Sequence, residues 1–280
     1  TGSAYVSLKN LVGSNGVIAA DVSGVGTARA GLSAATYGED KAIYAFGTGN
    51  VSMTNLVSNV GVISADVTGT GTGRIGPAAC GYGGDKAVFA YGDGSGTHLA
   101  VRNLVNSSGV MASDVSAAGT PRFQLAGSEY GGDKGIFGYG SDEPGTVRRN
   151  YSNLVSNTGV LSADVTGVGT ARNYVNGASY GEDKAIIAYG SGSSDALQNI
   201  SNLISNSGVV ASDVSGVGTA RYGPAACGYG GDKAIFAYGQ ASGVVSMSNL
   251  VNSSGVVASD VSGVGTARRG SQGAGYSTSA

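Results

Sequence analysis

Short apolar segments separated by glycine-rich polar turns run through the whole chain. In one representative stretch, from Arg221 to Asp260, four such segments follow one another: 222–229, 233–238, 245–251 and 256–261. The second segment is apolar at successive positions, which suits a strand buried on both faces. Its short length and flanking glycines favour a strand over a helix, because each interior glycine costs a helix about 1 kcal/mol relative to alanine. The pattern therefore predicts four short β-strands in this stretch.

The same stretch recurs along the chain, and four polar anchors mark its copies. The first anchor is an arginine, found at Arg29, Arg74, Arg122, Arg172, Arg221 and Arg268. The second is the aspartate of an Asp-Lys pair, found at Asp40, Asp85, Asp133, Asp183 and Asp232. The third is an asparagine, found at Asn10, Asn55, Asn103, Asn153, Asn202 and Asn249. The fourth is the aspartate of an Asp-Val pair, found at Asp21, Asp66, Asp114, Asp164, Asp213 and Asp260.

Three of the four intervals between these anchors are constant. The asparagine precedes the Asp-Val aspartate by 11 residues, that aspartate precedes the arginine by 8, and the arginine precedes the Asp-Lys aspartate by 11. Only the interval from Asp-Lys to the asparagine changes, with lengths of 15, 18, 20, 19 and 17 residues. Binding residues often lie on loops that vary over a constant scaffold. We therefore expect the loop between the second and third strands of each repeat to carry function.

Four antiparallel strands per repeat are typical of a β-propeller blade. The chain begins with third and fourth strands, continues with five full sets and ends with a first strand, so we predict one propeller domain over 1–280, with six four-stranded blades. Aligning Thr1 with Gln240 and Ala280 with Lys233 leaves no counterpart of 234–239. We therefore expect both termini to close the last blade, which lacks its second strand. That gap is open to three interpretations: it is empty, a partner strand fills it by β-augmentation, or residues outside this numbering fill it.

Composition excludes several kinds of partner. The net charge is −2, which gives no basis for binding nucleic acid. No apolar run approaches the roughly 20 residues that span a bilayer, so we expect no membrane span. The two cysteines, Cys80 and Cys227, occupy equivalent positions of two repeats. Opposite places in a closed ring are too far apart for a disulfide, so we expect two free, buried thiols.

Two runs of residues carry a resemblance to known repeats. They are YGGDKAIFAYG, from 229 to 239, and SMSNLVNSSGVVASDVSGVGTAR, from 246 to 268. The order of an arginine, a small-residue strand, an apolar strand and a variable loop resembles the kelch class of propeller, although Tyr91-Gly92 and Tyr139-Gly140 stand where that class has Gly-Gly. The runs are more closely similar to repeats in structural proteins of marine tailed bacteriophages, over essentially the whole chain. This resemblance implies a component of the virion, at the tail or its appendages.

Catalytic chemistry has little support in the sequence. The one histidine, His98, lies in a variable loop, and we expect it to be exposed and incidental, because a catalytic base needs an orienting partner. The Asp-Lys aspartates are expected to accept hydrogen bonds from turn amides. A calcium site is the alternative, but the spacing does not match a known calcium loop. The glycine-rich run Gly-Val-Gly-Thr-Ala-Arg is not followed by a predicted helix, which a phosphate- or dinucleotide-binding loop requires. We predict no enzyme activity, no metal and no cofactor.

The six arginines begin the innermost strands, so we expect them to surround the mouth of the central channel. The favoured interpretation pairs each arginine with the aspartate eight residues earlier or with the copy of that aspartate in a neighbouring blade, because buried charges are rarely left unpaired. The alternative is an anion or acidic-glycan site at Arg29, Arg74, Arg122, Arg172, Arg221 and Arg268.

The variable loops hold most of the candidate binding residues, because exposed aromatic and arginine side chains are favoured at recognition surfaces. These candidates are His98, Asp142, Glu143, Arg148, Arg149, Tyr151 and Asp195. We therefore predict a non-enzymatic structural or adhesion protein of a virion, whose loops contact a host-surface glycan or another virion protein. The alternative is a secreted, extracellular lectin with repeated sugar sites between its blades.

Overall fold

The computed structural model describes residues 5–142 and 147–276. Within these residues the fold is all-β and contains no α-helix, only the single 3-10 turn η1 at Ser193–Asp195. The prediction of an all-β fold is therefore confirmed. Glycine-rich turns and short apolar segments account for it, because each segment is long enough for a strand and too short for a stable helix.

Five antiparallel sheets of three or four strands follow one another along the described chain, and in each the second strand lies between the first and the third. Sheet 1 consists of β1 (Ser33–Tyr37), β2 (Lys41–Ala45) and β3 (Thr54–Val57). Sheet 2 consists of β4 (Ala78–Tyr82), β5 (Lys86–Ala90), β6 (Val101–Val105) and β7 (Val115–Ser116). Sheet 3 consists of β8 (Ala126–Tyr130), β9 (Lys134–Gly138) and β12 (Ser152–Val155). Sheet 4 consists of β13 (Asn176–Tyr180), β14 (Lys184–Ala188) and β15 (Ser201–Ile204). Sheet 5 consists of β16 (Ala225–Tyr229), β17 (Lys233–Ala237) and β18 (Ser248–Val251).

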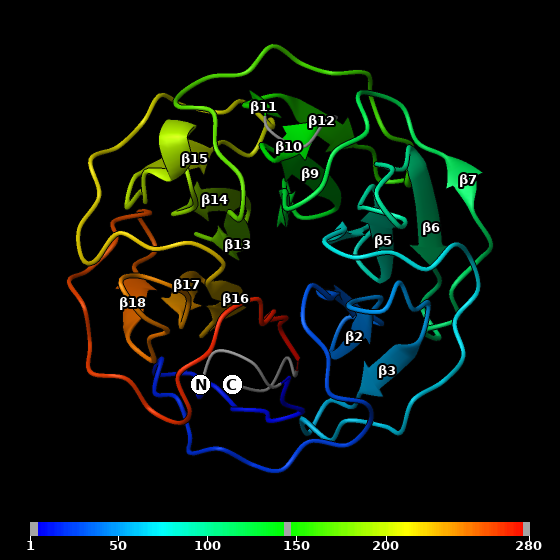
Figure 1. Cartoon of the computed structure of the whole chain (residues 1–280), viewed down its shortest axis with the longest axis horizontal. Helices are drawn as coiled ribbons and strands as arrows, with labels where there is room; N and C mark the ends of the chain where they lie inside the picture. The colour runs from blue at the N-terminus through cyan, green and yellow to red at the C-terminus, as the bar shows by residue number, and fades with distance from the viewer. Residues whose placement is uncertain (1–4, 143–146, 277–280) are drawn as a thin grey trace.

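The sheets are arranged in a ring around a central opening (Figure 1). The first strand of each sheet lies nearest the centre and the third strand lies farther out, as β16 and β18 show. The first and last described parts of the chain lie in the remaining sector, between sheet 5 and sheet 1 (Figure 1). We call residues 5–22 and 266–276 the terminal segments and the space they share the terminal sector.

The fourth strand of each repeat is shorter than predicted. In sheet 1 it is reduced to two bridges, Thr54 with Val67 and Val57 with Ile63, and only sheet 2 has a named fourth strand, β7. A side chain interrupts the ladder: Asn55 Nδ2 donates to the carbonyl of Ser64 at 3.1 Å. The expectation of four full strands per repeat is therefore wrong for most copies. The fourth segment lies at the outer edge of its sheet and pairs with the third strand only, so no further strand replaces the lost ladder hydrogen bonds.

An aromatic residue follows each second strand and adopts a positive φ. These residues are Phe46, Tyr91, Tyr139, Tyr189 and Tyr238. The left-handed conformation ends the strand one residue before the predicted end and costs about 1 kcal/mol or more in a residue other than glycine. It turns the ring toward the next sheet, where Phe46 meets Phe89 with ring centroids 5.7 Å apart. The hydrophobic core therefore lies between neighbouring sheets.

Backbone hydrogen bonds also join each sheet to the next. The glycine after each of these aromatic residues donates to the carbonyl of the following repeat's arginine, as Gly140 does to Arg172 at 2.9 Å. The same bond runs from Gly239 to Arg268 at 2.8 Å, so sheet 5 is joined to the C-terminal segment.

The terminal segments contain no named strand among the described residues. Residues 5–22 form two bridges, Lys9 with Val22 and Val12 with Ile18. Side chains connect the two ends directly: Thr266 donates to Asp21 and Arg268 donates to Asn10. Side chains therefore join the two terminal segments, and the described residues do not show the predicted pairing of their strands in a shared blade.

Both cysteines are free, as expected. Cys80 is buried, but Cys227 is partly exposed, so the expectation of two buried thiols is wrong for Cys227. The neighbouring strand explains the difference, because Gly135 of β9 packs directly against Cys80 Sγ. The described residues place no strand at the equivalent position beside Cys227.

Candidate recognition face and buried arginine network

Four of the six repeat arginines are buried, and Arg122 shows the hydrogen bonds of the group most completely. The side chain of Arg122 is completely buried. Its Nε donates to the carbonyl of Tyr139 at 2.7 Å and its Nη1 donates to the carbonyl of Thr120 at 3.2 Å. Nη2 donates to Asn153 Oδ1 at 2.5 Å, and Nη1 lies 3.3 Å from Asp164 Oδ1. Burial lowers the pKa of Arg122, and the nearby negative charge of Asp164 opposes that shift.

The asparagine and the Asp-Val aspartate of the same repeat complete this network. Asn153 Nδ2 donates to Asp164 Oδ1 at 2.9 Å and to the carbonyl of Ser162 at 3.1 Å. Asp164 Oδ2 accepts from the hydroxyl of Thr120 at 2.6 Å and from its backbone amide at 3.0 Å. Burial would raise the pKa of Asp164, but these hydrogen bonds and the arginine outweigh it, so the pKa is lowered. The carboxylate is therefore held ionised beside the arginine.

All six arginines pair with the Asp-Val aspartate that ends their own repeat, which is the copy, one repeat on, of the aspartate eight residues earlier, so the neighbour-copy pairing is the one the protein uses. The pairs are Arg29–Asp66, Arg74–Asp114, Arg122–Asp164, Arg172–Asp213, Arg221–Asp260 and Arg268–Asp21. The last pair returns to the N-terminal segment. Four of these guanidinium groups are fully buried: Arg74, Arg122, Arg172 and Arg221. The anion-site hypothesis stays a prediction, and the burial of these groups does not favour it.

Five of the arginines also lie over the aromatic ring that follows the previous repeat's second strand. The guanidinium carbon is 3.8 Å from the ring centroid of Phe46 for Arg74, and 4.0 Å from that of Tyr189 for Arg221. The other pairs are Arg122 over Tyr91, Arg172 over Tyr139 and Arg268 over Tyr238. A desolvated cation over an aromatic face is attracted to it by roughly 2 kcal/mol. Each repeat arginine therefore contacts the preceding sheet through the aromatic ring, while its hydrogen bonds stay within its own repeat.

The variable loops lie on one face, beside the residues that follow the arginines. Backbone bridges join Phe123 to Ser141 and Asn173 to Ser191, so the turn after each arginine pairs with the start of the variable loop. Neighbouring loops also touch, since Asn50 Nδ2 donates to Ser95 Oγ at 2.9 Å. We call this surface the recognition face.

Charged residues of two loops meet on this face. Arg148, in the two-residue strand β11 (Val147–Arg148) that pairs with β10 (Ser141–Asp142), forms an ion pair with Asp195 of the next loop. Arg149 Nε donates to Asp142 Oδ2 at 2.6 Å, and this hydrogen bond raises the pKa of Arg149. The guanidinium of Arg149 also lies 5.4 Å from the ring centroid of Tyr151. Five of the predicted residues thus lie in one connected group, and Glu143 lies outside the described residues.

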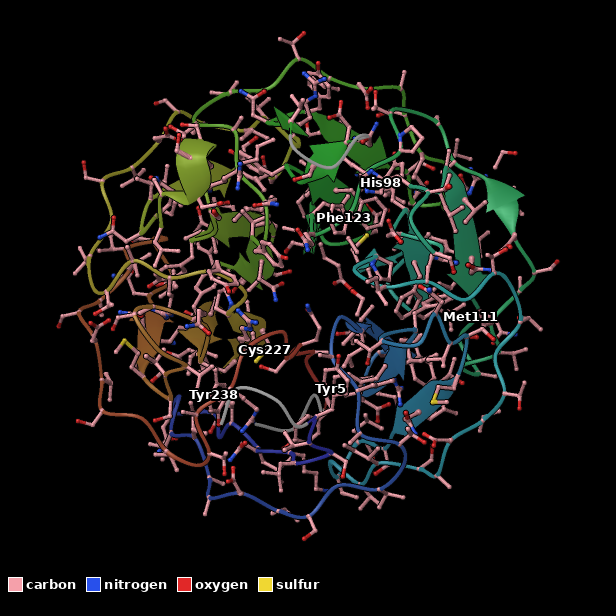
Figure 2. All side chains as sticks on the ribbon, in the orientation of Figure 1. Tyr5, His98, Met111, Phe123, Cys227 and Tyr238 are labelled. Atoms are coloured by element: carbon pink, nitrogen blue, oxygen red, sulfur yellow. The ribbon has the colours of Figure 1, made fainter. Side chains whose placement is uncertain are left out.

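His98 differs from the expectation. It is buried rather than exposed, at 8% of its possible surface. Its ring lies 4.6 Å from that of Phe123 and its Nε2 lies 3.6 Å from Asp93 Oδ2 (Figure 2). A bridge between Asp93 and His98 closes the loop tightly and turns the histidine inward. His98 therefore packs inside its loop and does not present its ring at the surface.

An aromatic group on the recognition face was missed at the level of sequence. Tyr174 and Tyr222 belong to neighbouring repeats, and their ring centroids are 5.0 Å apart. Arg269 lies 5.3 Å from the Tyr222 ring centroid and donates to its hydroxyl. Tyr174 is 39% exposed. One sequence feature could have revealed this group: the residue directly after the repeat arginine differs in every copy. The six residues are Ala30, Ile75, Phe123, Asn173, Tyr222 and Arg269.

The central opening contains a carboxylate that was also missed. A cavity of about 950 Å³ is lined by the first strands of all five sheets and extends into the terminal sector. Glu129, on β8, faces this cavity, at a position where the other first strands have threonine, glycine or serine. Burial raises the pKa of Glu129 to about 7, although a hydrogen bond from the amide of Gly81 opposes the shift.

The opposite face repeats the same contacts in several sheets. Asp133 accepts from Lys134 at 3.0 Å and from Asn157 at 3.1 Å, and both hydrogen bonds lower its pKa. Asp40 and Asp183 bind the corresponding lysine and asparagine. The expected hydrogen bonds to turn amides are therefore largely replaced by side-chain bonds. Across residues 5–142 and 147–276, no three His, Cys, Asp or Glu side chains lie close enough to hold a metal ion.

Neither a protein-family model nor a curated protein sequence matches this chain. In the described part of the chain, no helix has the length and apolar character needed to cross a membrane.

Proposed function

We propose that the chain is a six-bladed β-propeller with a kelch-like layout. Five sheets with the second strand at the centre supply five blades, and the terminal segments supply the sixth. The ion pair between Arg268 and Asp21 makes, across the two terminal segments, the contact that each of the other five arginines makes within its own repeat. A sixth blade shared by the two terminal segments accounts for this pair.

Its proposed role is that of a non-enzymatic structural or adhesion protein of a virion, which presents its recognition face to a host-surface glycan or to another virion protein. The observation that carries this proposal is the asymmetry between the two faces. The variable loops and the aromatic group share one face, while the Asp-Lys turns on the other face repeat. The assignment to a virion rests on the resemblance of the repeats to bacteriophage structural proteins.

The chemistry of the recognition face suits such contacts. The tyrosine pair offers exposed aromatic surface on which the apolar face of a sugar ring or a protein side chain can stack. Arg148 and Arg149 are held by carboxylates on the same face, so their remaining N–H groups are presented in a fixed geometry. Aromatic and arginine side chains of this kind supply most of the binding energy at protein surfaces.

The test compares two double variants of opposite faces. Arg148→Ala with Arg149→Ala changes the recognition face, and Lys134→Ala with Lys184→Ala changes the opposite face. Each protein is assayed for binding to host cells and to particle proteins. We expect a loss of about 10-fold or more in the first variant and none in the second, since one hot-spot arginine contributes about 2 kcal/mol. Equal behaviour of the two variants contradicts the proposal.

A lectin is the second candidate, because Tyr174 and Tyr222 come from neighbouring repeats and lie where a site between blades is expected. A glycan array distinguishes the two functions. Saturable sugar binding with several equivalents per chain indicates a lectin with repeated sites. Binding to particle proteins without sugar binding indicates an assembly role. Turnover of any substrate that is lost on changing Glu129→Gln contradicts both.

A further inference from the structure

One residue of each repeat forms an inner rim on the recognition face. It stands two positions after the repeat arginine and just before the first strand, which lies nearest the centre of the ring (Figure 1). Its backbone φ is positive in all six copies, between 52° and 65°. Backbone hydrogen bonds join neighbouring copies, as Gly76 donates to the carbonyl of Gly31 at 2.8 Å. The six rim residues are Gly31, Gly76, Gln124, Tyr174, Gly223 and Gly270.

Glycine suits the rim because of its backbone conformation and not because space is short. A Cβ atom added at Gly223 would lie 3.5 Å from the amide nitrogen of Gly270, and one added at Gly31 would lie 3.6 Å from that of Gly76. Both distances are ordinary van der Waals contacts. Glycine adopts a positive φ freely, whereas residues with a side chain are strained there. The conformation alone therefore accounts for glycine in four of the six copies.

Gln124 and Tyr174 occupy the rim in spite of this strain, with φ of 57° and 52°. A bulky residue in the left-handed region is an outlier, and strain of this kind is concentrated at functional sites. Tyr174 gains little burial in return, since it is 39% exposed. Its position therefore indicates a role for the side chain at the surface.

Other large side chains gather beside these two residues. Gln124 Oε1 accepts from Asn173 Nδ2 at 3.0 Å. The ring centroids of Tyr174 and Tyr222 are 5.0 Å apart, with their planes inclined by 53°. Arg269 is exposed, lies 5.3 Å from the Tyr222 ring centroid and donates to the Tyr222 hydroxyl. We call these five residues the tyrosine side of the rim.

The opposite side of the rim offers no such groups. Ala30 and Ile75 stand where the tyrosine side has Asn173 and Tyr222, and the rim residues that follow them are glycines. The six repeats thus share one scaffold and differ at the rim. A ligand that needs these side chains therefore meets one site per chain and not six.

We propose that the tyrosine side of the rim binds one acidic oligosaccharide per chain. A pyranose ring has an apolar face of C–H groups, which stacks on the exposed ring of Tyr174 and leaves the sugar hydroxyls at its edge. A carboxylate of the saccharide accepts hydrogen bonds from the exposed guanidinium of Arg269, whose planar array of N–H groups matches a carboxylate. This inference rests on the proposed function, because it names the ligand of the recognition face.

The experiment titrates 3′-sialyllactose and trigalacturonate separately into the full chain by isothermal calorimetry. Lactose and the methyl ester of trigalacturonate are their neutral counterparts. We expect saturable binding of an acidic sugar at one equivalent per chain. Its neutral counterpart should bind about 10-fold more weakly, because it cannot form the charged hydrogen bonds with Arg269. The acidic sugar that binds distinguishes a sialic acid from a uronic acid as the source of the carboxylate.

Two substitutions separate the stacking contact from the charged one. Tyr174→Gly should weaken binding of the acidic sugar about 10-fold or more without unfolding the protein, because glycine adopts the left-handed conformation freely. Tyr174→Asn repeats this test with a second residue that tolerates the conformation. Arg269→Gln should weaken the acidic sugar to the level of its neutral counterpart and leave the neutral sugar unchanged. Ile75→Ala, on the opposite side of the rim, is the matched control and should change neither.

Four results would overturn this inference. They are no binding of either acidic sugar, equal binding of the acidic and neutral forms, several equivalents per chain, and binding that both Tyr174 variants leave unchanged. The proposed function fails by a different result, which is equal behaviour of the two opposite-face double variants toward host cells and particle proteins. The titrations use purified sugars and leave Arg148 and Arg149 intact, so the two failures are distinguishable.

Discussion

The buried asparagine of the arginine network gives the sharpest test of how each repeat is held together. Asn153 is completely buried and connects three groups: the guanidinium of Arg122, the carboxylate of Asp164 and the carbonyl of Ser162. Changing Asn153→Leu keeps a side chain of similar size and removes all three hydrogen bonds. It leaves a buried arginine N–H and a buried carbonyl without their partner.

The magnitude follows from the kinds of bond that are lost. A hydrogen bond to a charged group contributes about 1.5–3 kcal/mol and a neutral one about 0.5–1.5 kcal/mol. Two of the three bonds involve a charged partner. Water reaches Asp164, whose side chain is 26% exposed, and replaces part of what it loses. We therefore expect the free energy of unfolding to fall by about 3–5 kcal/mol.

Asn10 supplies a matched control. It makes the same three contacts, with Arg268, Asp21 and the carbonyl of Ala19, but it is only half-buried. Water replaces more of the lost bonds there, so Asn10→Leu should cost about 1 kcal/mol. The difference between the two variants depends on burial alone, because the residue type and the contacts are the same.

Urea denaturation measures both variants, followed by far-UV circular dichroism and by the emission of the 15 tyrosines. The two signals must give the same transition, because repeat arrays can lose cooperativity and a single free energy is then undefined. A loss in Asn153→Leu no larger than in Asn10→Leu would refute the assignment of the buried network as a main source of stability within each repeat.

Three further predictions concern single groups. The raised pKa of Glu129, about 7 against an ordinary 4.5, means that the folded state binds this proton more tightly, so stability falls as pH rises from about 4.5 to about 7 and then levels off. Glu129→Gln should flatten that profile and gain about 1–3 kcal/mol at pH 8, and an unchanged slope of melting temperature against pH contradicts the assignment. Asp133→Asn removes the exposed ion pair with Lys134 and should leave the midpoint of urea unfolding unchanged. A clear shift of that midpoint would show that this ion pair stabilises the fold. Iodoacetamide should modify Cys227 slowly, because partial burial raises the pKa of its thiol to about 11. Peptide maps should show Cys80 unmodified, because its thiol is buried. Faster reaction at Cys80 than at Cys227 contradicts this difference in burial.

Much of the local structure is readable in the sequence because its causes are local. The positions of the strands follow from short apolar segments between glycines, and the variable loop follows from the one interval that changes length. The end of each second strand was misplaced by one residue, because the positive φ of Tyr238 depends on the sheet that its ring contacts. The fourth strand was overestimated for a similar reason, since the Asn55 side chain interrupts its ladder.

The candidate site was only partly predictable. Arg148, Arg149, Tyr151, Asp142 and Asp195 were selected from loop composition, and the structure connects them. The tyrosine pair was missed, because the contact depends on how closely two repeats approach and not on any spacing within one repeat.

What the sequence by itself determined is the repeat: its strands, its constant turns and its one variable loop. Each of these depends on residues a few positions apart, and the chain carries that information directly. The tertiary structure alone decided which copy each residue meets. Every repeat contains the same arginine and the same aspartate, so the letters cannot distinguish Arg122 paired with Asp114 from Arg122 paired with Asp164. The arrangement of the sheets in space makes that choice.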